Sequence, residues 1–255
     1  MNHFFLVKTP VREPDFLRPL SLALDRSTLI EALDMRDYAE PAFGPYGSLF
    51  PQLASPPEAL PFEPERAAAL LDEAGWMDVD DDGVREKDDV PLSFTLSTTA
   101  GNERREGAVQ IIQSQLADVG VRAEVRLEEF RSLLGRAMAR DYQAALLGWQ
   151  VGLDPDISMF WSDAESPFNL VGFANPKVTA LIDSAQSQST SESAAPYWRE
   201  AARMIASEYP YAWLWFFDMP LAVGPRVRGV VADVTGFGAG MSAWWIPADL
   251  RHEGR

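Results

Sequence analysis

Residues 91–149 read PLSFTLSTTAGNERREGAVQIIQSQLADVGVRAEVRLEEFRSLLGRAMARDYQAALLGW, and the spacing of their apolar residues predicts the fold. The apolar period switches between two, which is typical of strands, and about 3.6, which is typical of helices. Strands are predicted over 92–97, 121–127 and 142–149, and helices over 109–119 and 130–137. This β-α-β-α-β order predicts an α/β sheet with right-handed crossovers.

The rest of the chain adds elements around this unit. The same patterns predict a buried strand at 4–7, helices around 16–24, 29–33, 64–74, 176–185 and 197–205, and a β segment at 211–224. Pro19 is expected in the first turn of its helix, where a missing N–H costs little. Gly75 and Gly120 are expected to end two of the helices. Residues 39–64 are rich in proline, glycine and aromatic residues and predict an ordered surface loop.

Composition excludes several classes of protein. The 255 residues carry a formal net charge of −16, which repels phosphate backbones and argues against a nucleic-acid partner. The chain has no cysteine, and its two histidines, His3 and His252, lie at opposite ends. A histidine-dependent catalytic triad, a metal centre and a bound cofactor are therefore not expected. We interpret residues 1–255 as one folding unit.

Several motifs then follow in one order. The run Asp15–Ile30 resembles the "D-x-x-x-R-x-A-x-x-x-A-x-D-R-x-x-L-I" signature of the dipeptide/oligopeptide-type (family 5) substrate-binding proteins. Phe62–Trp76 is similar to the family's "D-P-x-x-A-x-x-L-L-x-E-A-G-[WY]". Further matches are Gly148-Trp149, Asp154-Pro155-Asp156, Gly172–Pro176 and Tyr209-Pro210-Tyr211. The resemblance covers about residues 4–230.

The resemblance implies a fold and a function. The matched part is the C-terminal lobe of such a protein, a periplasmic-binding-protein type II-like α/β lobe whose mixed, largely parallel sheet is flanked by helices. The first lobe is missing from the match. The family binds peptides or similar small solutes in an inter-lobe cleft and passes them to an ABC permease in the membrane, without catalysis. Its members act in the periplasm or another extracytoplasmic space, although residues 1–8 have no export-signal pattern.

The candidate ligand site lies where the strand 142–149 ends, because ligands of open α/β sheets bind beyond the carboxyl ends of strands. The resemblance places Trp149 in the cleft, where an indole offers a large and rigid contact surface. Its other candidate ligand contacts are Gln150, Asp154, Phe168 and Asn169. The family's peptide binders carry an aspartate for the peptide ammonium near the position of Gly152, so sugars and other solutes stay open beside peptides.

Other polar groups allow further interpretations. Residues 78–83 mimic the start of a calcium loop, but Asp89 at the twelfth position is too short, and a polar hairpin is favoured. Arg104 and Arg105 are expected to be solvated. The pair Asp154 and Asp156 keeps a hydrolase open as a weak hypothesis. Two more hypotheses stay open for the whole chain: a ligand-sensing domain of a transcription regulator, and a truncated fragment that binds nothing.

Overall fold

The structure is a computed structural model that describes residues 2–7, 14–54, 61–149, 152–218, 222–231 and 240–251. A six-stranded sheet in the order β2-β8-β1-β7-β5-β6 forms its centre. The strands of this sheet are β1 (Asn2–Val7), β2 (Ala39–Pro41), β5 (Ser93–Thr99), β6 (Arg122–Glu128), β7 (Ala144–Trp149) and β8 (Ala212–Phe217). A separate hairpin pairs β3 (Glu86–Lys87) with β4 (Val90–Pro91). Residues 78–83 lie in the preceding turn, which the antiparallel bridge between Met77 and Glu86 closes, so the predicted polar hairpin is confirmed there.

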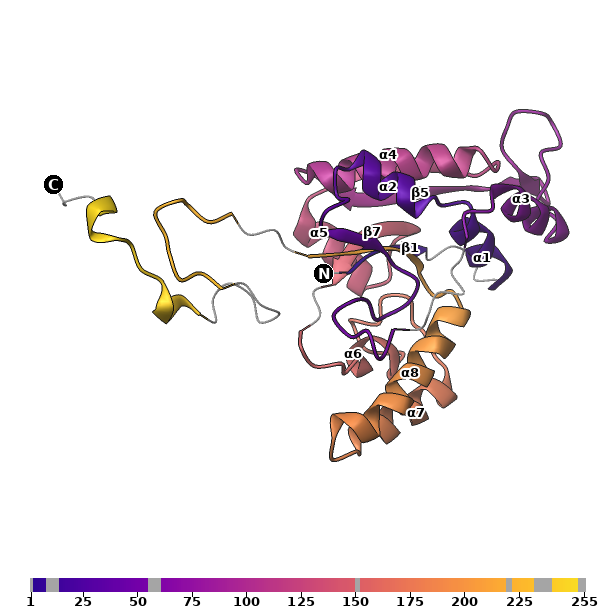
Figure 1. The fold of residues 1–255 in the computed structure, drawn as a ribbon. Coiled ribbons are helices and arrows are strands. Elements are labelled where there is room, and N and C mark those ends of the chain that lie inside the picture. Colours follow the sequence, from indigo (N-terminus) through magenta and orange to yellow (C-terminus); the bar gives the residue numbers. More distant parts are fainter. Residues whose placement is uncertain are drawn as a thin grey trace.

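Helices flank the sheet on both faces (Figure 1). They are α1 (Pro14–Leu22), α2 (Arg26–Ala32), α3 (Pro64–Glu73), α4 (Glu103–Ala117), α5 (Phe130–Met138), α6 (Ser158–Trp161), α7 (Pro176–Gln186) and α8 (Ser191–Ser207). In the view of Figure 1, α2 and α4 lie on one side of the strands, and α6, α7 and α8 lie on the other. The predicted α/β architecture is confirmed.

The sheet is mixed, as expected, but its parallel part is smaller than the sequence suggests. β5 pairs in parallel with β6 and β7, whereas β1 pairs antiparallel with β7 and β8, and β2 pairs antiparallel with β8. The crossover rule for parallel neighbours applies to β5, β6 and β7, which the helices α4 and α5 connect along the chain. β1, β2 and β8 join the sheet through partners far away in sequence, and periodicity carries no information about their direction.

Helix ends follow local chemistry. The Asn102 side chain accepts a hydrogen bond from the Arg105 N–H (3.1 Å) at the start of α4, and the Asn175 side chain caps α7 in the same way. Gly75 and Gly120 follow helices with φ of 85° and 80°, a left-handed conformation that glycine adopts without a Cβ clash. Both predicted stops are confirmed.

The predicted place of Pro19 is wrong. The helix α1 begins at Pro14, which leaves Pro19 inside the helix instead of in its first turn. The apolar pattern from Phe16 onward sets the phase of a helix but not its first residue. Pro19 therefore removes one backbone hydrogen bond from α1, although its own carbonyl still accepts from the Ala23 N–H (3.0 Å).

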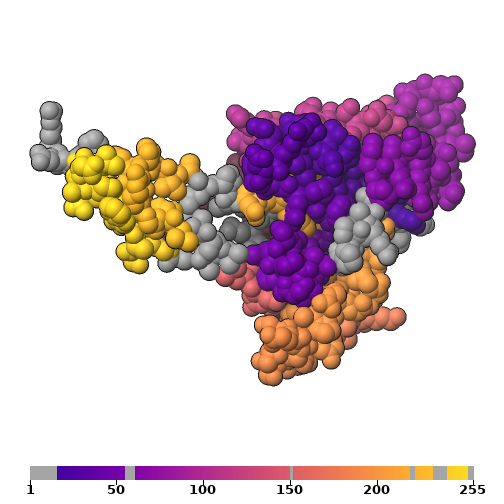
Figure 2. Space-filling model, in the orientation of Figure 1, coloured from indigo at the N-terminus to yellow at the C-terminus, as the bar shows by residue number. Residues whose placement is uncertain are grey.

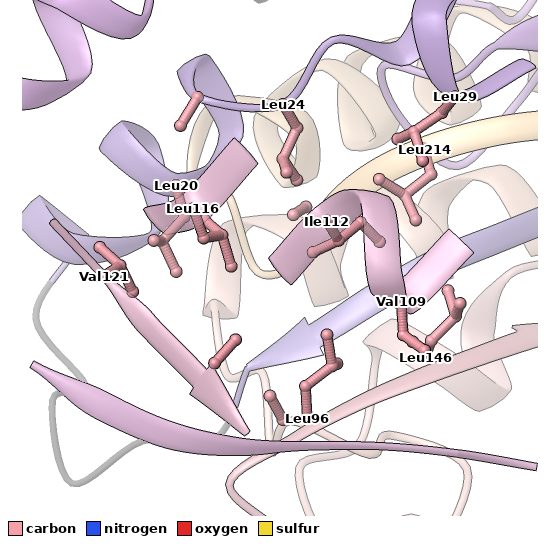
Figure 3. Packing of buried hydrophobic residues seen from close by; sticks show 14 of the residues in the cluster. Leu20, Leu24, Leu29, Leu96, Val109, Ile112, Leu116, Val121, Leu146 and Leu214 are labelled. Carbon is pink, nitrogen blue, oxygen red and sulfur yellow. The ribbon is translucent and has the colours of Figure 1, made fainter. Parts of the chain in front are cut away.

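Two apolar cores cover the two faces of the sheet. The first joins α1, α2, α3 and α4 to the strands. In Figure 3, Leu20 lies beside Leu116 and Leu29 lies beside Leu214, so residues far apart in sequence meet in this core. The second joins α5, α6, α7, α8 and the loop 42–53 to the opposite face. Both Trp149 and Phe216 belong to the second core.

Arg26 connects the turn between α1 and α2 with β8. Its buried guanidinium donates to the Trp213 carbonyl (2.7 Å), and also to the carbonyls of Ser21 (3.1 Å) and Leu24 (3.0 Å). Trp213 lies where the pairing of β1 with β8 shifts register, a place where strand carbonyls lose their ladder partners. Burial lowers the pKa of Arg26 to about 10, so the guanidinium stays charged at neutral pH.

The C-terminal arm, residues 222–231 and 240–251, lies apart from the sheet and its helices (Figure 1). Arg228 and Trp245 bridge its two parts through backbone hydrogen bonds of 2.8 and 3.1 Å. Apolar side chains are exposed on both parts, including Val231, Met241 and Trp245.

Candidate functional site

Trp149 is the last residue of β7 and sits at the carboxyl edge of the sheet, opposite Asn2 of β1. Its ring is half-buried and packs against the Phe160 ring at 4.9 Å and the Phe168 ring at 6.0 Å. The Trp149 side chain also packs against the second core, where its indole nitrogen is buried. The indole is thus held in one orientation, and part of its surface stays accessible at the sheet edge.

The turn after β7 is organised by its own carboxylates. Asp154 accepts a hydrogen bond from the Asp156 N–H (3.0 Å), and Asp156 accepts from the Ser158 N–H (2.8 Å) and from the Gln186 side chain (2.8 Å). These bonds shape the turn that starts α6. Gly152 and Leu153 are exposed beside it. Gln150 lies outside the described residues.

The two carboxylates of this turn do not resemble a catalytic acid and base. Partial burial tends to raise the pKa of Asp156, but the hydrogen bonds from Gln186 and Ser158 outweigh it and hold that pKa below its usual value. A general acid at neutral pH needs a raised pKa. The structure therefore gives the hydrolase hypothesis no support.

Phe168 and Asn169 have different roles in the loop before α7. Phe168 is 36% exposed and faces the Trp149 ring, so it can contact a solute. Asn169 is completely buried, and its amide donates to the carbonyls of Asp163 (3.0 Å) and Phe173 (2.8 Å) while accepting from the Phe173 N–H (2.8 Å). This geometry does not support a direct ligand contact by Asn169. It holds the loop that presents Phe168.

A second feature of the same edge was not expected from the sequence. A cavity of about 460 Å³ lies between the loop 43–54 and the end of β8. Apolar side chains dominate its lining: Pro41, Phe43, Pro45, Tyr46, Pro51 and Phe216. A smaller hollow of about 170 Å³ adjoins it, shares Glu40, Ser48 and Phe216, and extends to Asp218. The aromatic and proline-rich composition of 39–64 predicts an ordered loop. It does not predict that this loop packs on β8 and leaves a cavity there.

The loop and the turn after β7 are in direct contact. The buried Tyr46 hydroxyl donates to the Pro155 carbonyl. Burial, and then the nearby charges of Asp156 and Asp154, raise the pKa of Tyr46, so its hydroxyl stays protonated and able to donate. The cavity and the Trp149 cluster are therefore neighbours on one surface.

The expectation of two solvated arginines is wrong. Arg105 is buried and donates to the Thr99 hydroxyl (3.2 Å). The Arg104 guanidinium lies over the rings of Tyr38 (5.6 Å) and Phe217 (5.1 Å). Cation–π stacking of this kind fixes the side chain to the end of β8. Sequence spacing could not show that α4 begins beside this strand.

The acidic loop before β3 gathers four carboxylates. One ligand atom from each of Asp78, Asp80, Asp82 and Glu86 lies within 4.8 Å of the others. Asp82 pairs with Arg122 (3.1 Å), and Asp78 accepts from the Gly83 N–H (2.9 Å). These contacts are those of a hydrogen-bonded polar turn, in agreement with the hairpin interpretation.

Comparison with solved structures identifies the fold. The oligopeptide-binding protein AppA from Bacillus subtilis, in complex with a nonapeptide, matches with a TM-score of 0.84 at 23% identity, over 96% of this chain and 50% of that chain. NikZ from Campylobacter jejuni, in complex with Ni(L-His), matches with a TM-score of 0.82 at 20% identity, over 95% and 51%. The chain has the α/β fold of the type II periplasmic binding proteins, as predicted.

Sequence comparison identifies the family. The model of the bacterial extracellular solute-binding proteins, family 5 (middle), matches residues 1–169, and the chain belongs to this family. Oligopeptide-binding protein AppA of Bacillus subtilis is 26% identical over 89% of this chain and 43% of its own length. Di/tripeptide-binding protein 2 of Pseudomonas aeruginosa is 26% identical over 79% and 37%. The chain thus spans less than half the length of these curated relatives. Within the part that the structure describes, no helix is long and apolar enough to cross a membrane.

Proposed function

We propose that this chain is the C-terminal lobe of a two-lobed binding protein that captures peptides or similar small solutes for an ABC importer and catalyses no reaction. One observation carries the proposal. Trp149 is half-buried at the carboxyl edge of the sheet, with Phe168 beside it, inside the motif order of family 5. A rigid aromatic surface at this edge suits a solute that is gripped between two lobes.

The residues that we propose as solute contacts are mainly those with accessible surface at the carboxyl edge of the sheet. Trp149 and Phe168 supply the stacking surface, and Asp154 has one carboxylate oxygen outside the turn hydrogen bond. Gln150 stays in the proposal through its place next to Trp149 in the sequence. Asn169 has an indirect role, since its buried amide holds the loop of Phe168 in place.

The C-terminal arm supports a partner lobe. Trp245 is 54% exposed and Met241 is 55% exposed, and Figure 2 shows the arm set to one side of the main body. Exposed apolar side chains mark a contact surface where they gather in one patch, whereas scattered ones are common on protein surfaces. We infer that a first lobe covers them, in keeping with relatives that are about twice as long.

Solute binding would then be coupled to closure of the two lobes. β1 and β8 are neighbours, and the start of β1 and the end of β8 both lie at the edge of Trp149, so the chain enters and leaves this lobe beside the site. A solute that contacts both lobes stabilises the closed state by its extra affinity for that state. The permease recognises the closed form outside the cytoplasm, in the periplasm or its equivalent.

The test is retention of a solute by the two-lobed protein. The protein is incubated with pools of peptides of two to eight residues and of small saccharides, desalted, and measured by native mass spectrometry. We expect one bound solute per protein, and its loss in the Trp149→Ala variant. Failure to retain any peptide or saccharide, or equal retention by the variant, would contradict the proposed function.

A further inference from the structure

β6 forms one edge of the sheet, and among the described residues no strand pairs with its outer side. The Arg122 N–H donates to the Leu92 carbonyl (3.0 Å), and the Glu128 carbonyl accepts from the Ala100 N–H (2.8 Å). The backbone groups of these two β6 residues therefore point toward β5. Alternate residues of a strand direct their backbone groups to opposite sides. The N–H and carbonyl groups of residues 123, 125 and 127 thus face outward.

The outer side of β6 is suited to strand pairing. Edge strands are often protected by proline, by bulges or by charged side chains. β6 contains no proline, and its ladder with β5 runs without a register shift. The Gln113 side chain donates to the Ala123 carbonyl, but a carbonyl has a second lone pair that can accept from another strand. The charges of β6 therefore decide which partner it accepts.

These charges alternate in sign along one face of the strand. Arg122–Glu128 reads RAEVRLE, with an arginine or a glutamate at every second position. Every second side chain of a strand points to the same face. Glu128 pairs with Arg136 of α5 (2.9 Å), which places the charged row on the face that α5 covers. At its centre, Glu124 and Arg126 are exposed and form no salt bridge with any described residue.

The charged row is complementary to itself when two copies of β6 run antiparallel. With Val125 opposite the partner's Val125, Glu124 faces the partner's Arg126 and Arg122 faces the partner's Glu128. These are the non-hydrogen-bonded positions of an antiparallel ladder, where opposite Cα atoms are about 4.5 Å apart and opposite charges attract. In the same register the outward backbone groups of 123, 125 and 127 meet those of 127, 125 and 123.

The other face of β6 agrees with this register. Leu127 is 47% exposed, whereas Ala123 and Val125 of the same face pack in the first core. Opposite Leu127 stands the partner's Ala123, whose small side chain leaves room for the leucine. Pairing thus covers apolar surface that a single chain exposes to water.

We propose that two copies of this chain pair antiparallel through β6, about a two-fold axis at Val125, so that their sheets join into one. A second copy fits better than a different protein, because the charge row matches its own reverse. An interface of this kind is isologous, so each contact occurs twice. β5 lies between β6 and β7, so the pairing does not involve Trp149 and is independent of the proposed solute site.

The test is sedimentation velocity of the full-length protein over a range of concentrations, up to about 0.5 mM because one strand pair buries a small area. We expect a reversible dimer that weakens as salt is added. Glu124→Arg turns two attractive contacts into two repulsive ones, so it should raise the dissociation constant at least about tenfold. Arg126→Glu should have the same effect.

Two combinations and a control test the register. The double variant Glu124→Arg/Arg126→Glu again pairs opposite charges, as does an equal mixture of the two single variants, and both should restore the dimer. Glu192→Arg makes the same change of net charge at an exposed site on α8 and should leave the dimer intact. Circular dichroism confirms that each variant is folded.

Three results would overturn the proposal. The first is a monomer at every concentration, and the second is a dimer that Glu124→Arg and Glu192→Arg affect equally. The third is a folded double variant, and a mixture of single variants, that stay monomeric. None of these results bears on solute binding, so the proposed function would stand or fall separately.

Discussion

Replacement of Arg26 tests how the turn between α1 and α2 stabilises the fold. The Arg26→Met variant removes three hydrogen bonds to the carbonyls of Trp213, Ser21 and Leu24, at distances of 2.7, 3.1 and 3.0 Å. A buried acceptor that loses its partner costs about 1–3 kcal/mol. Relief from burying the charge offsets part of this loss. The expected net decrease in the free energy of unfolding is therefore about 3 kcal/mol.

The assay for Arg26 is urea unfolding followed by circular dichroism, with thermal unfolding as a second measure. In a chain of this size, about 3 kcal/mol corresponds to a decrease in Tm of roughly 6–12 °C. Arg18→Met is the control, because Arg18 is an exposed residue of α1 and its loss should change stability by less than about 0.5 kcal/mol. If Arg26→Met unfolded at the same urea concentration as the Arg18 variant, the reasoning would be refuted.

Three further changes test the site and its supports. Asn169→Leu should lower the unfolding free energy by about 2–3 kcal/mol in urea titrations, since its buried amide makes three bonds; a change below about 0.5 kcal/mol would contradict a structural role. Burial tends to raise the pKa of Glu128, but bonds from Ser97 and Arg136 hold it below the ordinary value. Its stabilisation is thus present in full above the unfolded-state pKa of about 4.3 and is lost as the pH falls through the lower folded-state pKa. Glu128→Gln should therefore cost about 1–2 kcal/mol at pH 7 and progressively less as the pH falls through that pKa, and a pH-independent cost would argue against this. Gly47→Ala should destabilise by about 1–3 kcal/mol, because its Cβ would lie 2.5 Å from Phe216, and wild-type stability would show that the ring is free to move.

The parts of the fold that the sequence predicts well are set by local chemistry. The stretch from β5 to β7 alternates between two apolar periods, and each period matches the element that forms. Gly75, Gly120 and Asn175 end or begin helices through their own backbone or side-chain geometry.

The parts that the sequence does not predict depend on contacts between distant residues. The antiparallel pairing of β2 with β8 joins residues near 40 and 216, and no local pattern encodes it. Arg104 looks solvated until the rings of Tyr38 and Phe217 are known to lie beside it.

In the candidate site, too, local sequence patterns predict some features, and contacts between distant residues determine the others. The position of Trp149 at the end of β7 was predictable, because a long apolar run in the sequence ends at this residue. The buried state of Asn169 was not, since a polar residue in a loop is usually exposed. The cavity at Phe216 needs the loop, β2 and β8 together. Residue composition could indicate an ordered loop but not a hollow beneath it.

The most direct test of the central claim is calorimetric titration of the proposed two-lobed protein with the solute that it retains, in wild type, Trp149→Ala and Tyr197→Ala. Tyr197 is an exposed aromatic residue of α8, outside the described carboxyl-edge site, and serves as the control. Buried aromatic contacts at the centre of a binding site are worth about 2 kcal/mol or more, so Trp149→Ala should weaken binding by at least about 30-fold, and the control by less than about twofold. Unchanged affinity in Trp149→Ala would contradict a solute site at the carboxyl edge of this sheet.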